Sequence, residues 1–194
     1  MRPPTTKPAA VLLALVLVPL AARAVTVRLG VGLGARTVND AKVKNAYGSG
    51  FVQLPYLQVS IRPHLFLGLA YEGGYKKEGR LGVYNDAAVL TLRGLDLTLG
   101  TELRAKWAAA YLQAGYGLYE YRQKVPTTPF SSAHPVNRRQ STVVAAVGVR
   151  LYPEKFFYLT AEAKYVPLKV RPYDSAVDLG GWRFLGGLGF SLNL

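Results

Sequence analysis

Long segments with strict two-residue alternation constrain the fold of this chain more than any other feature of its sequence. The C-terminal segment GWRFLGGLGFSLNL (181–194) has large apolar residues at nearly every second position, with small or polar residues such as Arg183 and Gly187 between them. A period of two is that of a β-strand, whose successive side chains point to opposite faces. The large apolar residues need an environment other than water. The question is therefore which face of the strand points inward, because a glycine-rich face that carries an arginine is unusual on either side of a soluble sheet.

Eight segments of this kind can be laid out along the chain. They cover residues 25–36, 51–61, 64–75, 89–104, 107–121, 141–152, 156–166 and 181–194. An average globular strand holds about five or six residues, and these segments are about twice as long. A tilted strand needs about 9–11 residues to cross a bilayer, so the length of the segments favours strands that span a membrane.

The connections between these segments alternate in length. The tight ones are Arg62-Pro63, Ala105-Lys106 and Pro153–Lys155, and the long ones are 37–50, 76–88, 122–140 and 168–180. The pattern predicts an all-β fold, an eight-stranded antiparallel up-and-down transmembrane β-barrel over residues 25–194. The apolar faces then point to lipid and the small and polar faces point to the interior. Closing the sheet also removes the unpaired strand edges that hydrocarbon would not tolerate.

The N-terminus has the pattern of a secretory signal peptide. A basic segment, MRPPTTK, precedes the apolar run 9–21, and Ala22-Arg23-Ala24 fits the small-x-small cleavage pattern. We therefore expect residues 1–24 to be removed, so that Val25 begins the exported chain. The alternative is a membrane anchor, but the run is shorter than the roughly 20 residues that a spanning helix needs.

The composition limits the chemistry that the chain can carry. It has no cysteine, which excludes disulfides, thiolate metal sites and cysteine nucleophiles. No pattern of metal ligands or of cofactor-binding residues stands out, so we expect neither a metal nor a cofactor. The net charge of +13 raises the possibility of nucleic acid, but this is not an expected partner for an exported barrel.

In strand number, in the alternation of short turns and long loops, in the export signal and in the terminal strand GFSLNL, the chain resembles the small eight-stranded outer-membrane barrels of the OmpA/OmpX type. The resemblance covers about residues 25–194. It implies a place in the outer membrane of a double-membraned bacterium, contact with outer-membrane lipid and lipopolysaccharide, and recognition of the last strand by the barrel-insertion machinery. We expect a monomer. The likeness is one of architecture, which says little about activity.

Charged residues of both signs fall on the inward-facing positions of the segments. They are Arg28, Arg36, Glu72, Asp96, Glu102, Arg104, Arg150, Glu162, Lys164 and Arg183. Eight strands enclose an interior that side chains just fill, and a buried charge is costly unless it is paired. We therefore expect a network of ion pairs that plugs the lumen, with Arg28, Glu102, Arg104 and Arg150 forming a layer nearer the turns. A charged channel or gate is the alternative.

The long connections are rich in basic residues. They hold Lys42, Lys44, Lys76, Lys77, Arg80, Arg122, Lys124, Arg138, Arg139, Lys169 and Arg171. Arginine is a good bidentate partner for phosphate, so these loops could contact lipopolysaccharide. Ordinary solvated loop charge is an equally good explanation, because charge runs are weak signals of function.

Aromatic residues gather near the ends of the expected strands. On the loop side they are Tyr71, Tyr75, Tyr119, Tyr121, Tyr165, Tyr173 and Trp182, and on the turn side they are Phe156, Phe157 and Phe190. We interpret them as two girdles at the membrane interfaces, although Tyr119 and Tyr121 have inward parity.

One segment, SSAHP (131–135), brings a hydroxyl and an imidazole close together. Some eight-stranded barrels are lipid A acylation or deacylation enzymes that use a serine and a histidine. A nucleophile also needs a group that orients its base, and no acid stands near Ser131, Ser132 or His134 in sequence. We therefore favour a non-enzymatic structural or interaction role, in adhesion, envelope stability or ligand contact. A lipid A-modifying enzyme, a narrow porin-like channel for small hydrophobic solutes and a soluble lipocalin-like barrel with reversed faces are the alternatives.

The expected topology can be tested on intact cells. An even number of strands puts both ends of the barrel on one side, and outer-membrane barrels keep their short turns in the periplasm. A tag inserted at Ala133 should therefore be labelled from outside, and a tag at Lys106 should not. Labelling of the Lys106 tag alone would show the opposite orientation.

Overall fold

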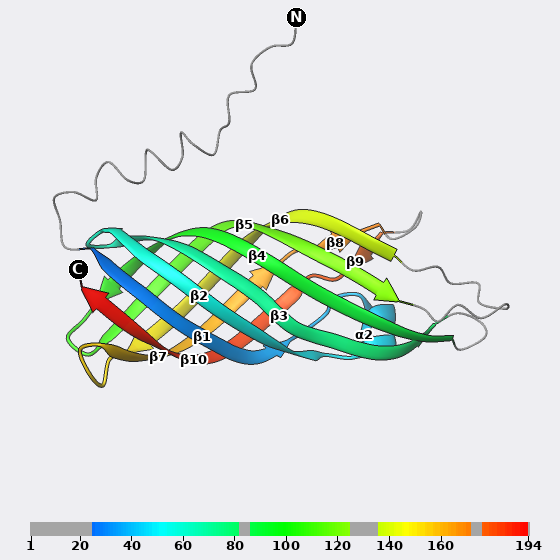
Figure 1. Cartoon of the computed structure of the whole chain (residues 1–194), viewed down its shortest axis with the longest axis horizontal. Coiled ribbons are helices and arrows are strands. Elements are labelled where there is room, and N and C mark those ends of the chain that lie inside the picture. Colours follow the sequence, from blue (N-terminus) through cyan, green and yellow to red (C-terminus); the bar gives the residue numbers. More distant parts are fainter. Residues whose placement is uncertain (1–24, 82–85, 125–135, 172–175, 194) are drawn as a thin grey trace, which may run out of the picture.

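The computed structural model describes residues 25–81, 86–124, 136–171 and 176–193, and within them eight antiparallel strands close into a barrel (Figure 1). The barrel strands are β1 (Thr26–Arg36), β2 (Gly50–Arg62), β3 (Leu65–Leu81), β4 (Asp86–Arg104), β5 (Ala108–Lys124), β6 (Val136–Leu151), β7 (Phe157–Val166) and β10 (Gly181–Asn193). Each barrel strand pairs with the next barrel strand along the chain, so that β7 pairs with β10. β1 also pairs with β10, which closes the sheet. The predicted fold class, an eight-stranded up-and-down barrel, is confirmed.

The two ends of the barrel differ. At one end, which we call the turn end, short connections join β2 to β3, β4 to β5 and β6 to β7, and both ends of the barrel sheet lie there (Figure 1). The other end, the loop end, carries a short helix, α2 (Ala41–Tyr47), and the two-stranded hairpin of β8 (Lys169–Val170) and β9 (Val177–Asp178). None of the helices in the described part of the chain has the length and apolar character of a membrane-spanning segment.

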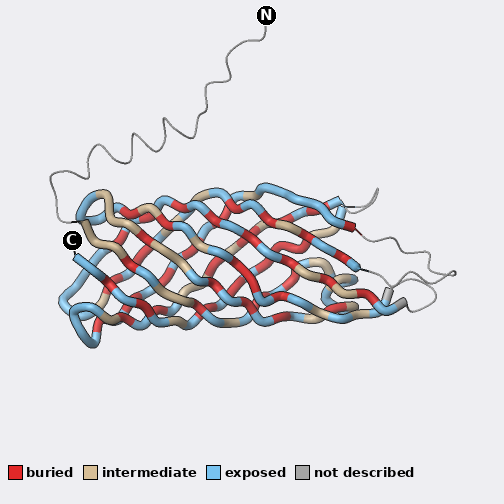
Figure 2. Tube along the Cα trace, in the orientation of Figure 1, coloured by how far each residue is buried: buried red, intermediate tan, exposed pale blue. Residues whose placement is uncertain are grey.

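Burial alternates along the barrel strands with the period that the sequence predicted (Figure 2). In the half of the barrel nearer the turns, apolar side chains lie on the outside: Leu97 is 54% exposed and Val147 is also 54% exposed. Their neighbours Asp96 and Thr98 are buried inside. The apolar residues are therefore on the outer face and the polar residues are in the interior.

Toward the loop end the polarity of the two faces is reversed, although the alternation continues in step. On β4 the buried side chains are Ala88, Leu90 and Leu92, whereas Arg93 is exposed. The buried polar residues of the half nearer the turns lie further along the same inner face of β4 and begin with Asp96. This loop-end part of the barrel thus has an apolar interior and a polar surface, as a soluble protein does.

This second zone corrects the predicted loop boundaries. The sequence analysis assigned 76–88 and 122–140 to loops, but β3 continues to Leu81, β4 starts at Asp86, β5 continues to Lys124 and β6 starts at Val136. On β5 the charged residues that suggested loops alternate with buried ones, and on β3 exposed residues alternate with partly buried ones, whereas Arg138 and Arg139 of β6 are both exposed. All of them lie in a regular ladder. A strand with a wet outer face needs no apolar outward side chains, so its polar composition resembles that of a loop.

The apolar interior of the loop end forms one cluster. It contains Val38, Tyr47, Tyr75, Ala88, Leu90, Leu92, Tyr119, Tyr121, Val136, Val144, Val166, Leu168, Val170 and Leu179. Helix α2 contributes Tyr47, and its N-terminus is capped by the Asp40 side chain, which accepts hydrogen bonds from two backbone amides of the first turn. The connections that hold α2 and the β8–β9 hairpin therefore close the loop end by packing on this cluster.

The inward-facing glycines make room for aromatic rings from neighbouring strands. A methyl group at any of at least five of these positions would collide with a ring, because atoms of the ring already occupy that space. The pairs are Gly30 with Tyr56, Gly94 with Tyr119, Gly100 with Phe66, Gly148 with Tyr111, and Gly189 with Tyr158. The glycine-rich face is thus part of a tightly packed interior.

The predicted aromatic girdles are correct in part. Tyr71 and Trp182 are exposed on the outer face at the loop side, and Tyr165 packs against Trp182. Phe157 and Phe190 pack edge to face on the turn side. Three members of the predicted loop-side girdle, Tyr75, Tyr119 and Tyr121, are buried inside the barrel, and Tyr173 lies outside the described residues.

The assignment of faces predicts how an outward charge is tolerated. Replacing Leu97 with arginine should destabilise the barrel in lipid vesicles by about 2–4 kcal/mol, because the side chain lies in the middle of the outward apolar band of β4. Leu103→Arg on the same strand and face, at the turn end, should cost only about 0–1 kcal/mol. Urea unfolding in vesicles measures both, and equal costs would contradict the assignment of a lipid-facing band.

Candidate functional site

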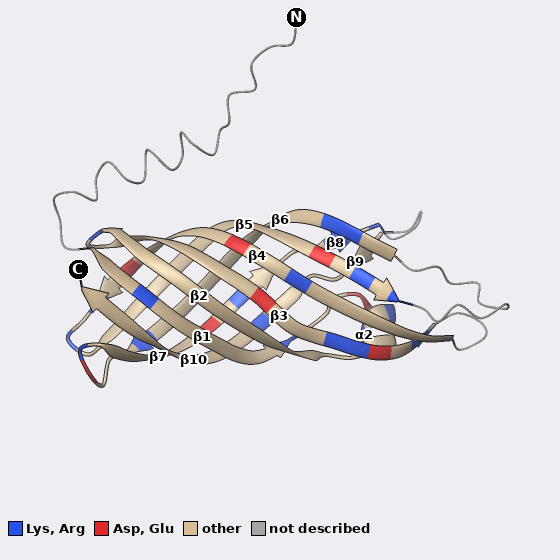
Figure 3. Ribbon diagram, in the orientation of Figure 1, with Lys and Arg blue, Asp and Glu red and all other residues tan. Residues whose placement is uncertain are grey.

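Charged side chains are buried in the interior of the barrel, and we treat this interior as the candidate functional site. Figure 3 colours the positions of the charged residues along the strands. The first group, which we call the loop-side cluster, is centred on Glu72 of β3. Its carboxylate lies 3.5 Å from Arg36, 3.0 Å from Lys164 and 3.2 Å from Arg183. Lys164 also forms an ion pair with Asp96. Three cations and two carboxylates from five different strands therefore meet within the lumen.

Neutral groups add hydrogen bonds to the loop-side cluster. The Tyr119 hydroxyl, which has one hydrogen to donate, lies 2.9 Å from an oxygen of Asp96 and 3.2 Å from an oxygen of Glu72, so the two carboxylates share it. The extra cation is held by backbone oxygens, because Arg36 donates to the carbonyl of Leu179 and Arg183 donates to the carbonyl of Gly181. These contacts tie the charges to the connection that closes the loop end.

A second group, the turn-side cluster, contains Arg28, Glu102 and Arg150. The Glu102 carboxylate accepts from Arg28 at 2.8 Å and from Arg150 through its other oxygen. Arg150 also donates to Gln58, and its guanidinium lies 4.0 Å from the centre of the Tyr111 ring. Stacking on an aromatic ring stabilises the second arginine, which shares its carboxylate with the first.

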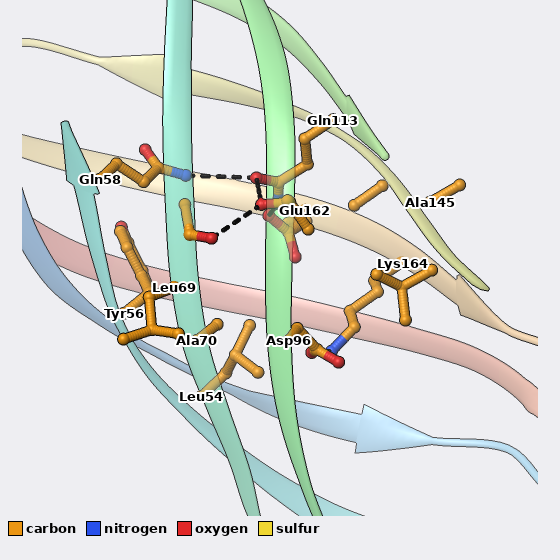
Figure 4. Close-up of a pocket in the computed structure, with 14 residues that line it drawn as sticks. Leu54, Tyr56, Gln58, Leu69, Ala70, Asp96, Gln113, Ala145, Glu162 and Lys164 are labelled. Carbon is orange, nitrogen blue, oxygen red and sulfur yellow. Dashed lines mark hydrogen bonds and ion pairs between the residues drawn. The ribbon is translucent and has the colours of Figure 1, made fainter. Parts of the chain in front are cut away.

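A polar layer lies between the two clusters. Glu162 accepts hydrogen bonds from Tyr111 at 2.7 Å and from Gln113 at 3.0 Å. Gln113 in turn accepts from Gln58 at 3.3 Å and from Thr98 at 3.2 Å, and Figure 4 shows it between Gln58 and Glu162. The negative charge of Glu162 thus lies between two clusters that each hold one cation in excess.

The remaining space in this layer is small. Only about 20 Å³ is open to the centre of a water molecule in the cavity that Glu162, Gln113, Thr98 and Lys164 line together with apolar neighbours. A cavity needs roughly 10–15 Å³ measured in this way to hold one water. The interior of the described barrel therefore has room for about one water at this level.

The structure places nine of the ten predicted lumen charges inside the barrel and the tenth outside the network. Arg104 is exposed at the turn end, where its guanidinium lies 4.4 Å from the centre of the Tyr152 ring. This corrects the predicted turn-side layer, because the last residue of a strand can turn its side chain to the rim. Sequence reasoning missed the neutral partners Tyr111, Tyr119, Gln58 and Gln113, whose inward parity was the available signal.

The basic residues that were assigned to loops lie mostly on regular elements. Lys76, Lys77 and Arg80 lie on β3, Arg122 and Lys124 on β5, Arg138 and Arg139 on β6, Lys169 on β8, and Lys42 and Lys44 on α2, and Arg171 follows β8. Two pairs of them, Arg138 with Arg139 and Lys169 with Arg171, line a groove of about 330 Å³. The positive charge of the loop end is therefore fixed on a folded surface.

The sequence motif considered for catalysis, Ser131, Ser132 and His134, lies outside the described residues. The other histidine, His64, lies at the turn end and contacts the backbone oxygen of Glu102 at 3.1 Å through Nδ1. Within the described ranges, no three acidic or histidine side chains are grouped as metal ligands.

No protein-family model and no curated protein matches the sequence. Solved structures match over most of the chain. The attachment invasion locus protein Ail of Yersinia pestis, solved with the heparin analogue sucrose octasulfate, is 11% identical with a TM-score of 0.60, over 88% of this chain and 100% of that one. The N-terminal β-barrel domain of Pseudomonas aeruginosa OprF is 14% identical with a TM-score of 0.55, over 86% and 97%. Neisserial surface protein A is 12% identical with a TM-score of 0.53, over 86% of this chain and 96% of that one.

These likenesses show the fold, which is that of the small eight-stranded outer-membrane β-barrels. The resemblance drawn from the sequence is confirmed at this level. At such low identities the likeness carries no residue-level role from one chain to another, so the function has to be argued from the interior and the surface of this barrel.

The ion-pair network predicts a large cost for removing a central cation. Lys164→Met keeps most of the side-chain volume but leaves Glu72 and Asp96 short of a partner, which should destabilise the barrel by about 3–5 kcal/mol. Lys106→Met, at an exposed turn position, should change stability by less than about 0.5 kcal/mol. Urea unfolding in vesicles gives both values, and a Lys164→Met variant as stable as its control would show that the network contributes little.

Proposed function

We propose that this chain is an integral outer-membrane protein of a double-membraned bacterium with a closed lumen, inserted after its signal peptide is removed, and that its basic loop end contacts anionic partners outside the cell. The observation that carries the proposal is the combination of a filled, ion-paired interior with an apolar outer band. The barrel serves as a membrane anchor, and its activity is one of contact and envelope support.

The size of the barrel and its charges support the proposal of a closed lumen. Eight strands leave an interior that side chains just fill, and here the aromatic rings packed on glycines and the two ion-pair clusters fill it. Opening a path would separate charges such as Glu72 and Lys164, and an unpaired charge in this interior is strongly unfavourable. This argument favours a plug over a narrow channel for hydrophobic solutes.

The interaction role is supported by the surface of the loop end. Its lysines and arginines lie on α2 and on the extended parts of β3, β5 and β6, so a folded surface presents them. Arginine pairs well with phosphate, the anionic group that the lipid A of the outer leaflet carries. The similar protein Ail was solved with a sulfated heparin analogue, and a comparable affinity for polyanions would fit adhesion or envelope stability here.

The closed sheet also bears on how the barrel is inserted and assembled. We propose that the insertion machinery recognises the alternating strand β10, which pairs with β1 to close the sheet. We also propose that the barrel works as a monomer, because its sheet has no open edge to pair with another copy. We propose no catalytic role.

Conductance in a planar bilayer tests the closed lumen. The unmodified protein should show no steady current, because the ion-pair clusters and the packed rings block the lumen. Glu162→Ala should destabilise the barrel and give brief, small current steps, since it removes the carboxylate between the two clusters and two hydrogen bonds. A large and stable single-channel conductance from the unmodified protein would replace the plug with a channel.

A further inference from the structure

Two neighbouring hollows follow the outside of the barrel wall over β3, β4, β5 and β6. The lower hollow, of about 260 Å³, is lined by the apolar side chains Tyr71, Leu95 and Leu118 and by polar ones above them. The upper hollow, of about 440 Å³, is lined mainly by residues of the polar zone. Arg93 and Glu120 line both, so the two hollows form one groove that runs up the wall.

The pairing of the strands fixes where the polarity changes along this groove. Arg93 pairs with Glu120, and Glu120 pairs with Arg139, so these three outward residues form one row across β4, β5 and β6. One outward row nearer the turn end, Leu95 pairs with Leu118, and both are about half exposed. The groove thus crosses the upper edge of the apolar band between two successive outward rows, from the leucine pair to the charged pair above it.

The row carries more positive than negative charge. Glu120 is paired with Arg122, at 3.5 Å. Arg93 and Arg139 form no ion pair with any residue that the structure describes. Beside Arg93, a β-bulge in β3 between Glu72 and Tyr75 interrupts the ladder, and its Gly74, at a φ of 84°, lines the upper hollow. Two arginines therefore face the groove with their hydrogen-bonding capacity available.

We propose that this groove binds one phosphorylated lipid of the outer leaflet. An acyl chain lies against Tyr71, Leu95 and Leu118. The phosphate lies above Glu120, whose charge Arg122 offsets, and is bound from its two sides by Arg93 and Arg139. A sugar headgroup extends into the upper hollow toward Lys76, Arg122 and Lys124, which line it. The assignment rests on the outer-membrane location proposed above, which puts the loop end at the outer leaflet.

The shape of the groove selects a lipid over a free anion, because half of its lower lining is apolar and continuous with the lipid-facing band. Its charge selects phosphate over a neutral headgroup, because guanidinium groups bind phosphate through two parallel hydrogen bonds. The other basic groove, lined by Arg138, Arg139, Lys169 and Arg171, shares Arg139 with this one. Its apolar lining is limited to Val170 and Ala176, and its remaining basic residues serve as a comparison.

Native mass spectrometry of the detergent-purified full-length barrel can count bound lipid. The probe is lipid A with two phosphates, titrated against the unmodified protein and against two double variants. R93Q/R139Q removes the proposed phosphate contacts, and K169Q/R171Q removes the same amount of charge elsewhere on the loop end. We expect R93Q/R139Q to lose about tenfold or more in apparent affinity and the control to lose less than about twofold.

Two further arms identify the source of the phosphate. Lipid A without phosphates should bind the unmodified protein about as weakly as the phosphorylated lipid binds R93Q/R139Q. Inorganic phosphate at millimolar concentration should leave the bound lipid in place. Equal losses in the two double variants would show diffuse surface charge, displacement by inorganic phosphate would show a soluble-anion site, and either result would overturn the proposal.

Heat-dependent mobility in detergent gels and the absence of conductance should be the same for all these variants, because the substituted side chains lie outside the lumen. With both properties intact, an unchanged lipid affinity in R93Q/R139Q would refute the lipid groove alone. Loss of the outer-membrane location or a conducting lumen in the unmodified protein would instead refute the function on which the groove rests.

Discussion

The rest of this structure depends on the need to satisfy every backbone hydrogen bond without water. A sheet that faces hydrocarbon cannot leave a strand edge unpaired, so β1 has to meet β10 and the sheet has to close. With eight strands the closed sheet is narrow, and the small diameter decides what the inner face can hold. Positions 94, 100 and 148 are glycine because an aromatic ring from the adjacent strand occupies the space that a side chain would fill there.

The same narrowness explains the chemistry of the interior. A polar inner face in a space without bulk water has to satisfy its own charges, and the barrel does so with two ion-pair clusters joined by amides and hydroxyls. Lys164 and Glu72 come from β7 and β3, which lie on opposite sides of the barrel. Such contacts across the lumen connect strands that share no ladder, and so they hold the cross-section of the barrel in one shape.

The sequence predicted the number of strands, their faces and the inward position of the charges, because a strict period of two leaves little freedom in a sheet with one apolar face. It did not predict the partners of Arg28 or Lys164, since these depend on the stagger between strands that are distant in sequence. It also missed the ends of β3 to β6. Lys76 and Arg138 on strands in water have the same composition as residues of a loop. Only buried residues of the neighbouring strands, such as Leu90 of β4 and Tyr121 of β5, reveal the ladder.

The reversal of polarity along β4 also bears on how faithfully the strand is paired. A slip by one residue would turn Leu95 and Leu97 into a lumen full of charges, and it would bring Asp96 out into lipid. The same slip would move Leu90 and Leu92 from their core into water and bury Arg93 without a partner. A misaligned strand thus loses stability twice, because its polar residues enter lipid in one half of the barrel and its apolar residues enter water in the other. The long β3–β4 and β5–β6 hairpins therefore reject misaligned barrels more strongly than strands that only spanned the bilayer would.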